Sequence, residues 1–121
     1  MKLPHRALSD LDIKEAVKKL GIKNFRGVFM RDKLPLKMKK TECGVVNLDE
    51  NKNEGTHWVS YVKKGQHISY FDAFGNLKPP LELREYFSRA GSNTVYNYNR
   101  FQNFNTFNCG HLCISFMYKN M

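Results

Sequence analysis

The stretch Gln102–Cys113, with the sequence QNFNTFNCGHLC, joins a polar, turn-prone run to an apolar segment that continues through residues 112–117. This change of pattern predicts a final helix that begins near Cys109. A thiol at a helix N-terminus lies at the positive end of the helix dipole, which favours the thiolate and lowers the thiol pKa. Cys109 is therefore the candidate nucleophile. The alternative is a buried structural cysteine, the commoner role for a single Cys.

Gln102 and Cys113 lie on either side of this cysteine and are expected to serve different purposes. A side-chain amide such as that of Gln102 can donate to an oxyanion alongside the nucleophile's own backbone N–H; the alternative is a plain loop amide. Cys113 falls one turn after Cys109, so we expect it to pack in the core. A zinc site of Cys109, Cys113, His111 and His57 would lack the ligand spacing of common zinc modules, so no metal is expected.

The composition predicts one domain over residues 1–121, because 41% hydrophobic and 13% aromatic residues suffice for a single core. No apolar run is long enough to span a bilayer, and the N-terminus lacks the apolar region of a signal peptide. The three cysteines leave at least one unpaired, which indicates a reducing compartment. We therefore expect an intracellular protein with no membrane association.

The formal net charge of +9 is concentrated in residues 1–40, where twelve Lys or Arg face four acids. Such asymmetry indicates an anionic partner, nucleic acid being the commonest. The bases expected to contact phosphate share one polar loop: Arg31, Lys33, Lys37, Lys39 and Lys40. The alternative is a solvated basic face that only aids solubility.

Local signals along the chain predict an α+β fold. A helix over Leu8–Leu20 would have Ser9 as its N-cap, a capping box with Asp12, and Gly21 after its end. A second helix is expected from Pro79-Pro80 to Gly91, since Pro is tolerated in a first turn. The expected strands are Phe25–Met30, Gly44–Leu48, His57–Val62, His67–Phe71 and Thr94–Tyr98.

The two middle strands predict a β-hairpin that brings His57 to Asp72. A turn centred on Lys64-Gly65 would set these two residues directly opposite each other, with Cβ atoms about 4.5–5.5 Å apart. The carboxylate would then fix the imidazole tautomer and leave the other ring nitrogen as a base. A bulge or another loop length would change this register. The alternative is a purely structural His–Asp pair.

The order of these motifs resembles the adenovirus maturation protease (adenain) family, part of a wider group that includes the ubiquitin-like-protein proteases. The matching motifs are Gly55–Trp58 (GTHW), Tyr70–Gly75 (YFDAFG), and Gln102 followed by Cys109-Gly110. Upstream, Leu11–Gly21, Phe25–Pro35 and Cys43–Asn47 are also similar to segments of the family. Two features depart from the adenoviral pattern. Asp72 replaces a Glu, and the sequence continues for only twelve residues beyond Cys109, without the helical C-terminal region.

The resemblance implies a small mixed β-sheet flanked by helices, with the nucleophile at a helix N-terminus. It makes His57 the general base, Asp72 its orienting acid, Cys109 the nucleophile and Gln102 the oxyanion donor. Gly110 and Trp58 would support the site. It implies no cofactor other than an activating peptide or DNA.

The resemblance further implies an endopeptidase that cleaves viral structural precursors after glycine, in the virion or the host nucleus. The source would be a DNA virus or a virus-like transposon, and DNA would be a second partner. Two alternatives remain open. The same catalytic set serves ubiquitin- or SUMO-directed isopeptidases, and a basic nucleic-acid-binding module could carry a vestigial set.

Overall fold

The computed structural model describes residues 3, 8–48, 57–73, 75, 79–90, 93–96 and 109–121. Its elements follow in the order α1 (Asp10–Leu20), β1 (Phe25–Met30), β2 (Thr41–Asn47), β3 (Trp58–Lys64), β4 (His67–Phe71), α2 (Leu81–Ser88), β5 (Asn93–Tyr96) and α3 (Cys109–Asn120). None of the helices described is both long and apolar enough to cross a membrane.

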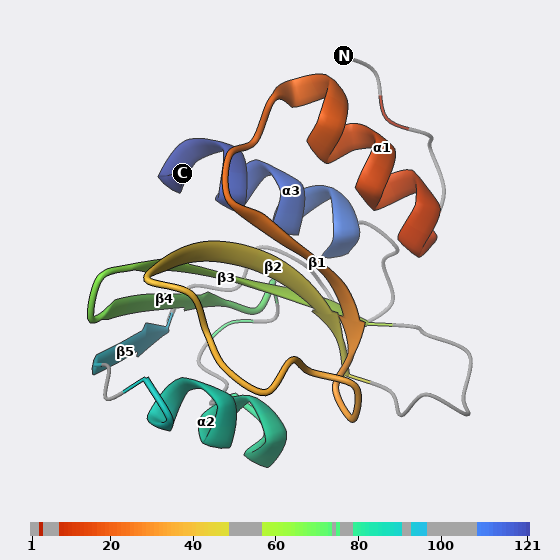
Figure 1. The fold of residues 1–121 in the computed structure, drawn as a ribbon. Coiled ribbons are helices and arrows are strands. Elements are labelled where there is room, and N and C mark those ends of the chain that lie inside the picture. Colours follow the sequence, from red (N-terminus) through yellow and green to blue (C-terminus); the bar gives the residue numbers. More distant parts are fainter. Residues whose placement is uncertain are drawn as a thin grey trace.

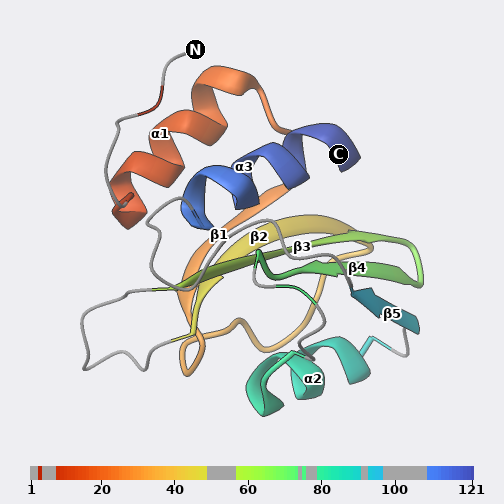
Figure 2. The same cartoon turned by 180° about the vertical axis from the view of Figure 1, so that it is seen from behind.

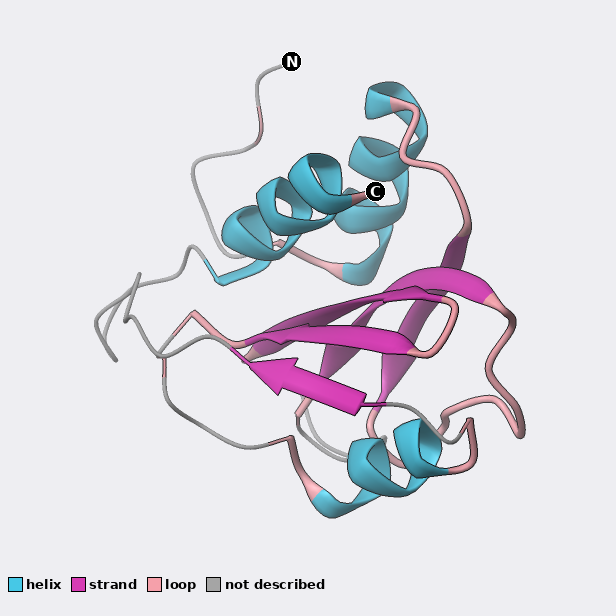
Figure 3. Cartoon of the chain, turned by 90° about the vertical axis from the view of Figure 1, so that its left-hand side faces the viewer, coloured by secondary structure: helices cyan, strands magenta, loops and turns pink. Residues whose placement is uncertain are grey.

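The five strands form one mixed sheet in the order β1-β2-β3-β4-β5. The two outer pairs are parallel, and β2, β3 and β4 are antiparallel. Helices α1 and α3 cover one face of the sheet and α2 lies against the other (Figure 1), an arrangement that is also clear from behind and from the side (Figures 2 and 3). The predicted α+β class, a small mixed sheet flanked by helices, is confirmed.

Helix α1 forms where its local signals predict. The Ser9 N–H donates to Asp12 Oδ2 at 2.9 Å, and the Asp12 N–H donates to Ser9 Oγ at 3.2 Å, which completes the capping box. Gly21 then ends the helix with φ 67°, a left-handed conformation that Gly adopts without steric cost. The inner face of α1 packs into a cluster shared with α3 and the sheet, through Ile13, Ala16 and Val17.

Several other boundaries differ from the predicted ones by one to three residues. Strand β2 begins at Thr41, three residues before the predicted Gly44, because residues 41–43 pair with the end of β3. Helix α2 begins at Leu81 because Pro80 is extended and acts as the N-cap, and the helix ends at Ser88. That end comes before the predicted Gly91, because Arg89 and Ala90 are already in a turn, and the predicted end of the last strand, Tyr98, lies outside the described residues.

The predicted hairpin register is wrong by two residues. Lys64 pairs with His67, and Tyr61 pairs with Tyr70, so the turn consists of Gly65 and Gln66 rather than being centred on Lys64-Gly65. Gly65 has φ 60°, which suits the first position of a two-residue hairpin turn. Since side chains alternate with a period of two, this shift leaves the predicted facing of His57 and Asp72 unchanged and makes them diagonal neighbours.

A buried carboxylate, Glu42 on β2, ties together elements on the α2 side of the sheet. It accepts hydrogen bonds from Tyr61 Oη at 2.5 Å and Tyr86 Oη at 2.8 Å, which connect it to β3 and α2. It also accepts from Arg26 Nη1 at 3.0 Å and from the Lys39 backbone N–H at 2.6 Å. The charge is therefore paired and hydrogen-bonded, as a buried carboxylate must be to be tolerated.

Glu42→Ala is expected to lower the free energy of unfolding by about 3–5 kcal/mol, because it leaves Arg26 and two buried hydroxyls without their acceptor. Glu82→Ala is the matched control, since it breaks a partly exposed pair with Arg31 at 3.5 Å and should cost under about 1 kcal/mol. Urea unfolding of both variants measures the difference. Equal losses would mean that Glu42 does not hold these elements together.

Candidate active site

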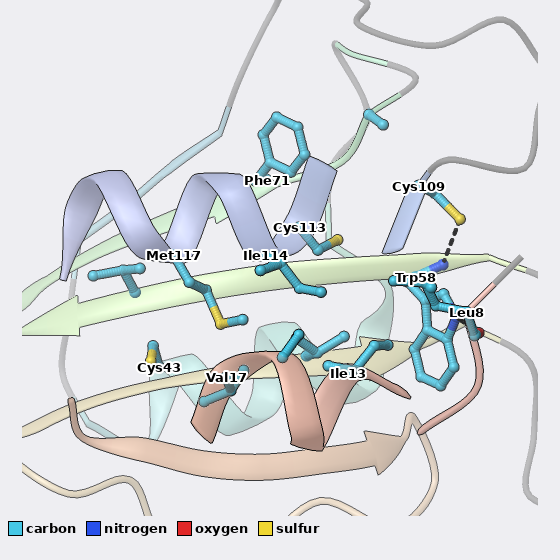
Figure 4. Close-up of a cluster of buried hydrophobic side chains, with 14 residues drawn as sticks. Leu8, Ile13, Val17, Cys43, Trp58, Phe71, Cys109, Cys113, Ile114 and Met117 are labelled. Carbon is cyan, nitrogen blue, oxygen red and sulfur yellow. Dashed lines mark hydrogen bonds between the residues drawn. The ribbon is translucent and has the colours of Figure 1, made fainter. Parts of the chain in front are cut away.

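The thiol of Cys109 lies where the start of α3 meets the start of β3. Cys109 is the first residue of α3, as predicted, and it is buried. The backbone N–H of Trp58, the first residue of β3, donates to Cys109 Sγ at 3.4 Å (Figure 4). Two segments far apart in the sequence thus fix the sulfur atom.

His57 and Asp72 form a direct pair beside this thiol. His57 precedes β3, Asp72 follows β4, and His57 Nε2 lies 2.9 Å from Asp72 Oδ1. The Asp72 side chain is 2% exposed and that of His57 is 15% exposed, so water screens their interaction little. His57 is also hydrogen-bonded to the Cys109 thiol. Because Nε2 faces the carboxylate, Nδ1 is the ring nitrogen left for the sulfur.

The surroundings favour the charged forms of both Cys109 and His57. Burial alone would raise the pKa of Cys109, but hydrogen bonds from His57 and the Trp58 backbone, together with the His57 charge, lower it below its ordinary value. Burial would lower the pKa of His57, but its hydrogen bonds to Asp72 and Cys109 raise it to about 9. The site therefore favours a thiolate–imidazolium pair, the reactive state of a nucleophilic cysteine.

The other two cysteines lack this environment. Cys43 is fully buried, and burial together with the nearby Glu42 charge raises its pKa to about 12. Burial also raises the pKa of Cys113 well above its ordinary value. Cys113 packs in the core cluster between α3 and the sheet (Figure 4), which confirms its predicted structural role.

Of the remaining predicted site residues, Gly110 and Trp58 are described by the structure and Gln102 is not. Gly110 is the second residue of α3 and is buried. Trp58 is buried in the core. Gln102 lies outside the described residues, as do Gly55 and Thr56 of the GTHW motif. Within the described residues, no group of three His, Cys, Asp or Glu side chains could hold a metal ion.

The predicted phosphate-contacting bases lie in the loop between β1 and β2, on the side of the sheet that α2 covers (Figure 1). Arg31 pairs with Glu82 of α2 at 3.5 Å and is half-buried. The other four bases are exposed: Lys33, Lys37, Lys39 and Lys40.

No protein-family model and no curated protein matches the sequence. The solved structures that match include two proteases. The chain is similar to the ASFV pS273R protease with a TM-score of 0.68 and 17% identity, over 98% of this chain and 58% of that one. It is similar to the SUMO protease Ulp1 with a TM-score of 0.62 and 16% identity, over 97% of this chain and 67% of that one. The chain thus has the fold of these proteases and spans little more than half the length of the ASFV enzyme.

Iodoacetamide near neutral pH is expected to label Cys109 and to spare Cys43 and Cys113. The Cys109 thiolate forms below the ordinary thiol pKa of 9.0, whereas Cys43 needs a pH near 12. His57→Ala removes the largest favourable contribution, so labelling of Cys109 should move to higher pH. Peptide mass mapping across a pH series measures this, with exposed His67→Ala as the control. Equal labelling of all three cysteines in the folded protein would contradict the prediction.

Proposed function

We propose that this chain is a cysteine endopeptidase in which Cys109 is the nucleophile, His57 the base and Asp72 the orienting acid. The observation that carries the proposal is the continuous hydrogen-bonded series Asp72–His57–Cys109 at the N-terminus of α3. The fold shared with two cysteine proteases supports it. Residues 1–121 would form a single protease domain, and Gln102 would complete the oxyanion hole.

The proposed reaction is acyl transfer. The Cys109 thiolate attacks the carbonyl carbon of the peptide bond, and the oxyanion is held by the Cys109 backbone N–H and the Gln102 amide. As the C–N bond breaks, His57 gives its Nδ1 proton to the leaving amine and a thioester remains. His57 then takes a proton from water, whose oxygen attacks the thioester, and the thiolate is regenerated. Asp72 holds the imidazole by Nε2 throughout.

We propose viral precursor proteins as the substrates, cleaved after glycine. The resemblance of the GTHW, YFDAFG and Cys-Gly motifs to the adenain family supports this choice, and the likeness to a protease of another virus agrees with it. Virion maturation would be the setting, inside the virion or the host nucleus. The likeness to a SUMO protease favours one alternative, an isopeptidase that acts on ubiquitin-like tails. An assay of such tails beside Gly-x-Gly peptides separates the two.

Cys109→Ala and His57→Ala are each expected to abolish peptide turnover, since nucleophile and base act as a unit. Gln102→Ala should lower kcat by about 10²–10³-fold, the usual cost of one oxyanion donor. Asp72→Asn should lower peptide turnover without abolishing it, because a carboxamide still holds the imidazole ring but favours the wrong tautomer. The assay follows release from a fluorogenic Gly-x-Gly peptide, and His67→Ala is the control. Full activity in Asp72→Ala would refute the assigned role of this carboxylate.

We also propose that the loop between β1 and β2 binds duplex DNA without sequence preference. Its backbone is held by buried Lys63, whose Nζ donates to the carbonyls of Lys39 and Lys40 at 2.9 and 3.0 Å, while the lysine side chains of the loop remain exposed. A backbone fixed in this way presents cations to phosphate with little ordering cost. Binding would hold the protease near packaged genome and its substrates.

Combined replacement of Lys37, Lys39 and Lys40 by Glu is expected to abolish DNA binding at low salt. In the unsubstituted protein, log affinity should fall with log salt concentration by about 0.9 per phosphate contacted. A fluorescence-anisotropy titration over a salt series measures both. The matched control replaces the exposed Lys14, Lys18 and Lys19 of α1 by Glu, and it changes the net charge by the same amount as the loop variant. Equal weakening by both triple variants would assign binding to net charge alone, and unchanged affinity in the loop variant would refute the proposal.

A further inference from the structure

Trp58 uses its two N–H groups to join three parts of the chain. Its backbone N–H donates to Cys109 Sγ at 3.4 Å. Its indole Nε1–H donates to the backbone carbonyl of Leu8 at 3.0 Å, and both hydrogen bonds are buried. Figure 4 shows the hydrogen bond from the Trp58 backbone to the Cys109 sulfur, with Leu8 next to the Trp58 side chain. The residue that contacts the nucleophile is therefore anchored to the segment just before α1.

Packing reinforces this anchor. A Cβ added at Gly110 would lie 3.2 Å from Leu8 Cβ and 3.3 Å from both Leu8 Cδ1 and Trp58 Cδ1. These distances are tight, so Leu8 and Trp58 close directly over the first turn of α3. Leu8 is itself buried and immediately precedes Ser9, the N-cap of α1. The start of α1 and the start of α3 are thus held against the same indole.

We propose that Trp58 and Leu8 are positioning residues for the Cys109 thiolate. The hydrogen bond from the indole N–H to the Leu8 carbonyl, here called the indole tie, holds the Trp58 backbone N–H at the sulfur atom. The inference rests on the proposed role of Cys109. A buried indole N–H normally requires a hydrogen-bond partner, and here that partner lies in the N-terminal segment. Without the tie, Trp58 and the adjoining His57 can relax away from α3. A charge-assisted N–H bond to the thiolate depends on short, well-aligned geometry, so such relaxation weakens it.

The cleanest test replaces the indole of Trp58 by a benzothiophene, which keeps the ring shape and removes only the N–H donor. Trp58→Phe is the genetic counterpart, and Leu8→Ala keeps the backbone carbonyl but removes the side-chain packing of Leu8 against the first turn of α3. Each change is expected to raise the pH midpoint of Cys109 alkylation by about one unit. At pH values below the midpoint, this equals a tenfold loss of thiolate. Val17→Ala is the matched control, because it opens a cavity in the same core cluster without touching the tie. It should lower stability in urea unfolding and leave the alkylation midpoint unchanged.

The outcomes separate positioning from mere core packing. An unchanged midpoint in the folded benzothiophene variant would overturn the proposal, as would an equal shift in Val17→Ala. If Leu8→Ala fails to fold, the Trp58 variants still decide the question. Alkylation needs no substrate, so a normal thiolate with no peptide turnover would refute the proposed protease function and leave this inference standing.

Discussion

The hydrogen bonding of β3 on both of its edges is the constraint on which the rest of the structure depends. Strand β3 pairs with β2 along one edge and with β4 along the other, and all of its residues except Lys64 are buried. Its first residue, Trp58, donates to the Cys109 thiol, and its middle residue Tyr61 binds the buried Glu42. A displacement of this strand would disturb the candidate site and the α2 side of the sheet together.

The charges at the candidate site are stable only as a group. Burial by itself acts against both ions, since it raises the pKa of a thiol and lowers that of an imidazole. Each ion is favoured because the other lies beside it, and Asp72 adds a hydrogen bond to the imidazolium. Such groups titrate as a coupled pair, so the pH at which the Cys109 thiolate forms depends on His57 as well.

The sequence predicted the features of this fold that arise from neighbouring residues. The capping box of Ser9 and Asp12, the helix beginning at Cys109 and the meeting of His57 with Asp72 are all present. The predicted hairpin register was wrong because moving the turn by one residue, from Lys64-Gly65 to Gly65-Gln66, shifts the pairing by two residues and presents the same faces to the core.

Contacts between distant residues had no local signal that could reveal them. The two tyrosines that donate to Glu42 lie 19 and 44 positions away, and Leu8 lies 50 positions from the indole N–H that its carbonyl accepts from. Gly44 shows a similar dependence, since an added Cβ there would lie 2.8 Å from the Tyr61 hydroxyl oxygen. Its lack of a side chain makes room for a ring that the sequence places on another strand.

The joining of Leu8, Trp58 and Cys109 has a consequence for biosynthesis. When translation has passed β4, the nascent chain holds the imidazole and the carboxylate, but the thiol has yet to be made. Once synthesised, Cys109 keeps the reactivity of a free thiol until α3 docks on the sheet and its sulfur meets the Trp58 backbone. The hydrogen bonds from Trp58 and His57 that favour the thiolate therefore form only after residues 109–120 have been made and α3 has docked on the sheet.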